Sequence, residues 1–137
     1  MEIEPRFIEA LNNKGNALAA LGKNEEAIEY YDRALMIDPH DVYTWNNKGT
    51  LLARLGNHLE ALKCYDKAIE IDSENADAWY YRARSHVASD NINNALNDLK
   101  KSIKIGNGKY IELLKKDDTF DKIRDDTRLT TMLNIKH

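Results

Sequence analysis

Residues 42–75 read VYTWNNKGTLLARLGNHLEALKCYDKAIEIDSEN, and they decide the fold because their neighbours in the chain repeat them. Residues 8–41 match this segment at 15 of 34 positions, and residues 76–109 match it at 7, including Trp45 with Trp79. Self-similarity at a fixed period of this length is typical of an array of like units. The sequence therefore predicts three units, at 8–41, 42–75 and 76–109.

Each unit is predicted to form two helices joined by a tight turn. Gly22 and Gly56 follow a leucine at the same place in the first two units, and glycine tolerates the left-handed conformation in which helices commonly end. The apolar residues around these turns recur with helical rather than strand spacing. A helical pair with one open apolar face must stack on a neighbour, which predicts an all-α solenoid.

Small residues at matching places in the first two units indicate close contact between the paired helices. Gly15 and Gly49 lie on the predicted first helices, while Ala27 and Ala61 lie on the predicted second helices. We expect each glycine to let the second helix approach over the alanine of the same unit. A bulkier side chain at either contact is expected to hold the pair apart.

The repeated residues carry a family resemblance. The pattern Trp45-x2-Lys48-Gly49, Leu52, Leu55-Gly56, Ala61-x3-Tyr65 and Ala68 is similar to the signature of the tetratricopeptide repeat (TPR) family. The third unit departs from that signature at several positions but keeps Trp79, Ala83 and Ala95 in phase. The resemblance implies a right-handed α-α superhelix of three helical hairpins, in which the first helices of the units line the concave side.

Residues 110–137 do not continue the repeat, since the 34-residue offset places Asp117 where a fourth small residue is required. Apolar residues at short helical spacings follow instead, namely Tyr110, Ile111, Leu113, Leu114, Phe120, Ile123, Leu129, Met132, Leu133 and Ile135. The last unit of a stack needs a polar outer face. We therefore expect residues 110–137 to form capping helices at the C-terminal end of a single domain, 1–137.

Composition and charge exclude several classes of protein. The 137 residues are 42% hydrophobic and 31% charged, which fits neither a disordered tail nor a membrane protein. With a net charge of −3, no nucleic-acid partner is expected, and no apolar run approaches the roughly 20 residues that a membrane span requires. The N-terminus lacks a secretory signal, and the lone Cys64 fits a reducing compartment, so a cytoplasmic location and no membrane partner are expected.

No arrangement of residues in the sequence favours catalysis. The histidines are His40, His58, His86 and His137, and none has a histidine or cysteine three or four residues further on, so no helical metal site is expected. Phosphate-binding glycine loops and nucleophile motifs are absent. His86 and Cys64 are interpreted as packing residues. We expect a protein that is not an enzyme and that binds neither metal nor cofactor.

The resemblance implies that ligand contacts come from the concave side of the first helices. The candidate peptide-binding residues there are Asn12, Asn16, Tyr43, Asn46, Asn47, Thr50, Arg54, Tyr80, Tyr81 and Arg84. Asparagine amides can pair with an extended peptide backbone, tyrosines add rigid area with a polar tip, and arginines can hold a carboxylate. The alternative interpretation is that the asparagines only solvate an exposed face and the tyrosines pack between units.

The function predicted from this surface is a non-catalytic adaptor or scaffold that binds a peptide segment of a partner protein in its concave groove. The alternative is a self-associating assembly protein that uses the same groove or its end faces, so a homo-oligomer remains possible. RNA binding is disfavoured by the acidic balance and by the lack of a continuous basic groove.

Some members of the TPR family bind the acidic C-termini of heat-shock chaperones through a carboxylate clamp, and the resemblance makes this a function to consider. At the clamp positions this chain has Asn12, Asn16, Asn47, Asp77 and Tyr81, so both asparagines are kept and all three cations are lost. An acidic terminus would lose most of its charge-assisted hydrogen bonds at these positions. A chaperone C-terminal carboxylate clamp is therefore not expected.

Three basic residues, Lys14, Lys48 and Arg82, share one position in successive units. Long side chains of this kind often lay their stems along the protein and keep the charge in water. We interpret them as reaching solvent past the hairpin.

Overall fold

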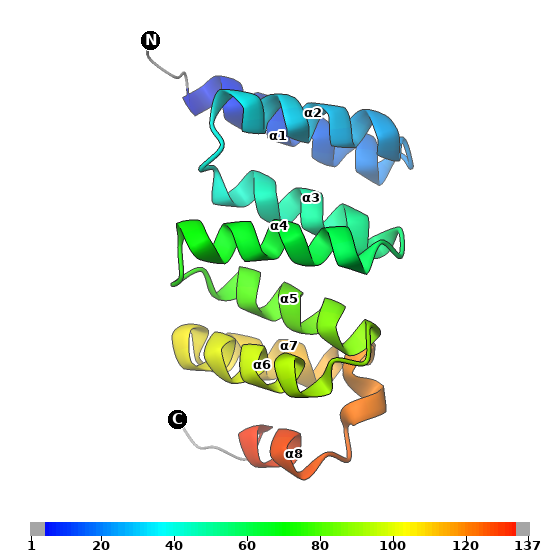
Figure 1. Cartoon of the computed structure of the whole chain (residues 1–137), viewed down its shortest axis with the longest axis vertical. Coiled ribbons are helices and arrows are strands. Elements are labelled where there is room, and N and C mark those ends of the chain that lie inside the picture. The colour runs from blue at the N-terminus through cyan, green and yellow to red at the C-terminus, as the bar shows by residue number, and fades with distance from the viewer. Residues whose placement is uncertain (1–4, 134–137) are drawn as a thin grey trace.

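A computed structural model describes residues 5–133 as a stack of antiparallel helices (Figure 1). The three units consist of α1 (Pro5–Ala20) and α2 (Asn24–Ile37), α3 (Val42–Arg54) and α4 (His58–Ile71), and α5 (Ala76–Ala88) and α6 (Ile92–Gly106). The tail forms α7 (Gly108–Lys116), the 3-10 helix η1 (Asp118–Ile123) and α8 (Thr127–Leu133). The predicted all-α solenoid is confirmed. The expectations for Ile135 and His137 lie outside the described residues.

The turns within the units form where the sequence predicts them. Gly22 and Gly56 have φ angles of +79° and +85°, in the left-handed region that glycine adopts without steric cost. The third unit makes the same turn at Asp90, with a φ angle of 61°. Aspartate is one of the few other residues that tolerate this region. The turn therefore persists in the third unit even though its glycine is replaced.

In the first two units the glycine of the first helix lies against a tyrosine ring of the second helix. A Cβ atom added to Gly15 would lie 2.6 Å from the ring of Tyr31, and one added to Gly49 would lie 2.7 Å from the ring of Tyr65. Both rings are buried, so they have little room to move. The sequence pointed to Ala27 at this contact, and the atoms nearest to the added Cβ of Gly15 belong to Tyr31.

Overpacking a core usually costs about 1–3 kcal/mol, and alanine is the better helix former by roughly 1 kcal/mol. Gly49→Ala is therefore expected to lower the free energy of unfolding by up to about 2 kcal/mol. Gly108→Ala is the matched control, because no atom lies within 4 Å of its added Cβ. Urea unfolding followed by circular dichroism measures both variants, and equal effects would contradict the contact with Tyr65.

Lys48 and Arg82 do not simply extend into solvent, because each forms an ion pair with an aspartate. The interpretation that they reach solvent past the hairpin is wrong for these two residues. Lys48 Nζ lies 2.7 Å from Asp32 Oδ1 on the preceding unit. Arg82 Nη1 lies 2.9 Å from Asp66 Oδ1, at the corresponding place one unit later. Each pair therefore joins the first helix of a unit to the second helix of the unit before it.

The C-terminal tail packs into the core of the third unit. Phe120 of η1 is fully buried, and its ring centroid lies 5.6 Å from that of Tyr80 on α5. The ring of Tyr80 also lies 5.7 Å from that of Tyr110 on α7. Helix α7 lies behind α6 in Figure 1, and α8 lies at the bottom of the stack. The tail thereby covers the third hairpin and brings η1 against α5.

Candidate functional site

Two hollows lie between the first helices of neighbouring units. The one between α1 and α3, here called the amide hollow, has a volume of about 400 Å³ and is lined by Ile8, Glu9, Asn12, Asn13, Asn16, Asp41, Tyr43 and Asn47. The one between α3 and α5, here called the arginine hollow, has a volume of about 470 Å³ and is lined by Thr50, Ala53, Arg54, His58, Tyr65, Tyr81, Arg84, Ser85, Ala88 and Thr119. Together they hold eight of the ten candidate binding residues.

Several amide groups of the amide hollow already form hydrogen bonds with other residues of the chain. Buried Asn12 donates from Nδ2 to Thr44 Oγ1 at 2.8 Å, and its Oδ1 accepts from Asn47 Nδ2 at 2.8 Å. Asn16 Oδ1 accepts a hydrogen bond from the Tyr31 hydroxyl. Tyr43, by contrast, has 72% of its surface exposed. The amide hollow therefore has a fixed polar floor and an open aromatic rim.

The remaining two candidates, Asn46 and Tyr80, line neither hollow. Asn46 is buried and donates from Nδ2 to Asn75 Oδ1 at 3.2 Å. Tyr80 is buried as well, and its hydroxyl donates to Asp117 Oδ2 at 2.8 Å. Both side chains hold units or the tail together at these positions. The alternative that the tyrosines pack describes the contacts of Tyr80, whereas Asn46 is buried and does not solvate an exposed face.

Two tyrosines form the floor of the arginine hollow. The ring centroids of Tyr65 and Tyr81 lie 5.9 Å apart, and the Tyr65 hydroxyl donates to Thr50 Oγ1 at 3.3 Å. Burial raises the pKa of both tyrosines above the ordinary value. The phenols therefore remain neutral hydrogen-bonding groups at physiological pH and add no negative charge to the hollow.

Two guanidinium groups give the hollow its positive charge. Arg54 is exposed and makes one long hydrogen bond, 3.4 Å, to the carbonyl oxygen of Ala19. Arg84 Nε lies 3.1 Å from Asp117 Oδ2, at ion-pair distance but without hydrogen-bond alignment. Its Nη2 donates to Thr119 Oγ1 at 3.4 Å. Arg84 therefore contacts both the hollow and the tail.

Asp117 is the carboxylate that already occupies this positive region. Burial alone would raise the pKa of Asp117, but hydrogen bonds from Tyr80 and Thr119 and the charge of Arg84 lower it below the ordinary value. The group is therefore ionised at neutral pH. The surroundings of Arg84 thus stabilise a carboxylate that is mostly withdrawn from water.

Three polar residues of the arginine hollow, His58, Ser85 and Thr119, were not among the candidate residues. His58 Nδ1 lies 3.5 Å from Ser85 Oγ, where α4 begins beside α5. Thr119 is 35 residues from Arg84 in the chain and reaches the hollow only because η1 packs against α5. No periodicity links the tail to the groove, so no signal in the sequence pointed to Thr119.

Cys64 and His86, the two residues interpreted as packing residues, lie away from both hollows. Burial raises the pKa of Cys64 to about 11, which keeps the thiol protonated and unreactive. His86 Nε2 lies 3.6 Å from Asp98 Oδ2, and burial lowers the pKa of His86. Within residues 5–133 no group of three His, Cys, Asp or Glu is placed to hold a metal ion. No helix in this range has the length and apolar content to cross a membrane.

Family models of the tetratricopeptide repeat match residues 8–41 and 42–75, and a second model of the same repeat matches residues 64–104. The chain belongs to the tetratricopeptide repeat family. This family and its fold are known as non-catalytic interaction modules. No curated protein matches the chain.

Solved structures of TPR domains share the fold. The TPR domain of Sgt2 from Aspergillus fumigatus has a TM-score of 0.77 at 25% identity and covers 91% of this chain and 83% of its own. The first TPR of Spaghetti (RPAP3), bound to the HSP90 peptide SRMEEVD, has a TM-score of 0.75 at 21% identity and covers 85% and 94%. The second TPR of Spaghetti, bound to the same peptide, has a TM-score of 0.68 at 23% identity and covers 72% and 91%.

The prediction that a chaperone C-terminal carboxylate clamp is not expected is wrong on this comparison, because two structures with this fold hold the HSP90 peptide. The prediction looked for cations only at the positions of the known clamp, where this chain has Asp77 and Tyr81. It did not weigh Arg54 and Arg84 as replacements for the missing cations. These two arginines line the arginine hollow instead.

Proposed function

We propose that the chain binds an acidic peptide segment of a partner protein along the amide and arginine hollows, and acts as an adaptor through that contact. The observation that carries the proposal is the arginine hollow, in which two guanidinium groups border one cavity. Arginine binds carboxylates through two parallel hydrogen bonds, and such charge-assisted bonds are stronger than neutral ones. A carboxylate is therefore the ligand group that this hollow fits best.

The partners that each arginine already has support this assignment. Arg54 is exposed, with a single long hydrogen bond, so its donors remain available to a ligand. Arg84 presents its Nε and Nη2 to the tail, and its side chain is still 42% exposed. A ligand carboxylate can therefore bind Arg54 and approach Arg84 from the solvent side. His58 and Thr50 add further polar atoms at the edge of the same cavity.

The amide hollow is suited to a different part of the peptide. Asn13 and Asn16 are exposed on α1, and amide side chains pair with a peptide backbone as donor and acceptor. Glu9 and Asp41 line this hollow, so an acidic group is disfavoured there. The opposite charges of the two hollows predict one orientation, with acidic residues over Arg54 and neutral or basic residues near Glu9.

The peptide SRMEEVD tests the proposal, because it carries one basic residue near its start and three acidic residues toward its end. We expect it to bind the chain, and we expect Arg54→Gln or Arg84→Gln to weaken binding by about 10-fold or more. The estimate takes about 1.5–3 kcal/mol for a hydrogen bond to a charged group, and about 1.4 kcal/mol for each factor of ten. Fluorescence anisotropy of a labelled peptide measures these affinities.

Matched controls separate the hollow from general charge attraction. Lys63 is exposed on α4 and lies outside both hollows. Lys63→Gln removes one positive charge there, so the affinity of this variant for SRMEEVD should stay near that of the wild type. The peptide SRMQQVN with an amidated end keeps the length but removes the carboxylates, and it should bind weakly to every variant. Equal loss in Lys63→Gln and Arg54→Gln, or no binding of SRMEEVD at all, would contradict the proposal.

A further inference from the structure

The interface between units one and two follows a pattern on one face of α3. Thr44 is fully buried and accepts from Asn12 of the preceding unit. Four residues later, Lys48 forms the ion pair with Asp32. Leu51 completes the face and packs into the core of the first unit. This face therefore combines small or apolar residues with a central cation that meets a carboxylate.

The interface between units two and three repeats the same arrangement one period later. Ala78 and Ser85 are fully buried on α5 at the positions of Thr44 and Leu51. Arg82 lies between them and binds Asp66 of the preceding unit. Two successive interfaces of the chain thus consist of the same contact, a central cation on the first helix of one unit and an aspartate on the second helix of the unit before it.

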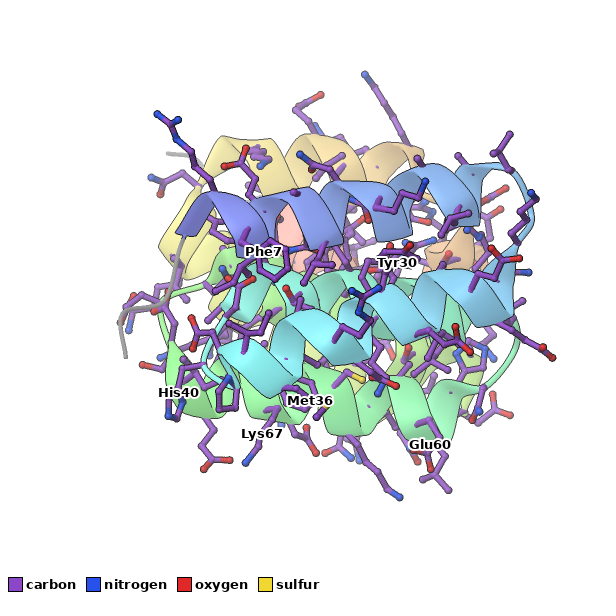
Figure 2. All side chains as sticks on the ribbon, turned by 90° about the horizontal axis from the view of Figure 1, so that it is seen from above. Phe7, Tyr30, Met36, His40, Glu60 and Lys67 are labelled. Carbon is purple, nitrogen blue, oxygen red and sulfur yellow. The ribbon has the colours of Figure 1, made fainter. Side chains whose placement is uncertain are left out.

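No part of the chain between residues 5 and 133 covers the corresponding face of α1. Ala10, Lys14 and Ala17 stand at the three matching positions and are all exposed. Phe7 on α1 and Leu21, in the turn just after it, extend this row and are 50% and 72% exposed. Figure 2 looks onto this end of the stack, where Phe7 lies beside α1 and none of the described helices lies over it. We call these five residues the α1 stripe.

We propose that the α1 stripe is a docking surface for a helical hairpin of a partner protein, one whose second helix presents an aspartate or glutamate to Lys14 from an apolar face. The two covered interfaces supply the argument, since each pairs the equivalent cation with an aspartate at 2.7–2.9 Å. Lys14 is in no ion pair with any residue between 5 and 133. The partner supplies the carboxylate that no residue between 5 and 133 offers to Lys14.

A second copy of this chain does not have the required chemistry. Asp32 and Asp66, the two aspartates of the correct kind, are already paired with Lys48 and Arg82. The equivalent position in the third unit is Lys100, which would place a positive charge against Lys14. Helix α8 also packs against α6 at that end. The charges therefore favour a different polypeptide over head-to-tail stacking of copies.

A grafted hairpin serves as the probe for this surface. A duplicate of residues 8–41 is inserted before Ile8 of the full chain, in the register of the natural 34-residue repeat, so that the duplicate of Asp32 faces Lys14. We expect the thermal midpoint to rise by about 5 °C or more, because a new interface between units adds to the stability of the array. Differential scanning calorimetry of the grafted and original chains measures the shift.

Charge variants identify the contact that produces the shift. Lys14→Glu should remove most of the gain in the grafted chain, and in the original chain it should leave the midpoint within about 1 °C, as expected for an exposed side chain. Reversing the charge of the partner as well, by changing the duplicated Asp32 to Lys, should restore the gain. This pairwise rescue separates the ion pair from any general effect of chain length.

Three results would overturn the proposal. The first is a grafted chain that melts no higher than the original. The second is a gain that survives Lys14→Glu unchanged. The third is a dimer of the original chain, detected by sedimentation, that Ala17→Glu dissociates, since a second copy would then be the occupant. None of these results bears on SRMEEVD binding, because the α1 stripe and the two hollows share no residue.

Discussion

Replacing Asp98 by alanine is expected to lower the free energy of unfolding by about 3–5 kcal/mol, the usual cost of leaving a buried charge without its partner. The Asp98 side chain is only 4% exposed and accepts two hydrogen bonds from Arg82, from Nη2 at 2.8 Å and from Nε at 2.9 Å. His86 lies against the same carboxylate. The variant therefore leaves Nε and Nη2 of Arg82 without their acceptor and removes the carboxylate beside His86.

The chain provides a matched control for Asp98 in the other aspartate bound to Arg82. Asp66 accepts from Nη1 at 2.9 Å but is 62% exposed, and exposed ion pairs contribute about 0–1 kcal/mol. Asp66→Ala should therefore have a small effect, and Asp98→Asn, which keeps the shape of the side chain, should fall between the two. Chemical unfolding followed by circular dichroism gives the order. An equal loss for Asp66→Ala and Asp98→Ala would contradict the dominance of the buried pair.

Replacing Phe120 by alanine is expected to destabilise the C-terminal tail by about 3–5 kcal/mol, the range for a large buried aromatic residue. The ring is fully buried among aromatic side chains of α5 and α7. Its loss leaves a cavity beside Tyr80, and η1 has no other buried residue as large. Hydrogen exchange should show the loss of protection first in residues 108–133, where the tail depends on this contact.

Leu113→Ala is the control for this prediction, because Leu113 also belongs to the tail but is 42% exposed on α7. We expect its effect to stay within about 0.5 kcal/mol, as is usual for surface substitutions. Global unfolding of Phe120→Ala without earlier exchange in the tail would show that the tail and the stack unfold as one unit. A loss below about 1 kcal/mol would contradict the central role of the ring.

The fold was predictable because the repeat is local and periodic. Gly22 and Gly56 end their helices as expected, because the left-handed turn is a property of the residue and its neighbours. The contact of Gly15 with Tyr31 was not predicted, because sequence spacing identifies a face of a helix but not which side chain on that face reaches furthest. The ring of Tyr31, one turn beyond Ala27, supplies the atoms nearest to Gly15.

The candidate site was predictable only where one helix determines it. Tyr43 and Arg54 border the hollows because their positions on α3 place them there. Asn46 and Tyr80 were also chosen by position, but long-range contacts with Asn75 and Asp117 hold them inside the protein. Such contacts depend on which segment packs alongside, and a pattern within one unit does not contain that information.

The contact of Arg84 with both the hollow and the tail has a thermodynamic consequence. A ligand that draws Arg84 away from Asp117 must weaken the hold of the tail, and by linkage a firmly held tail must oppose that ligand to the same extent. The groove and the C-terminal cap therefore share the donors of one arginine. Substitutions in the tail would thus change the affinity for the peptide without changing any groove residue. Evolution could therefore adjust how tightly a partner binds separately from which partner binds.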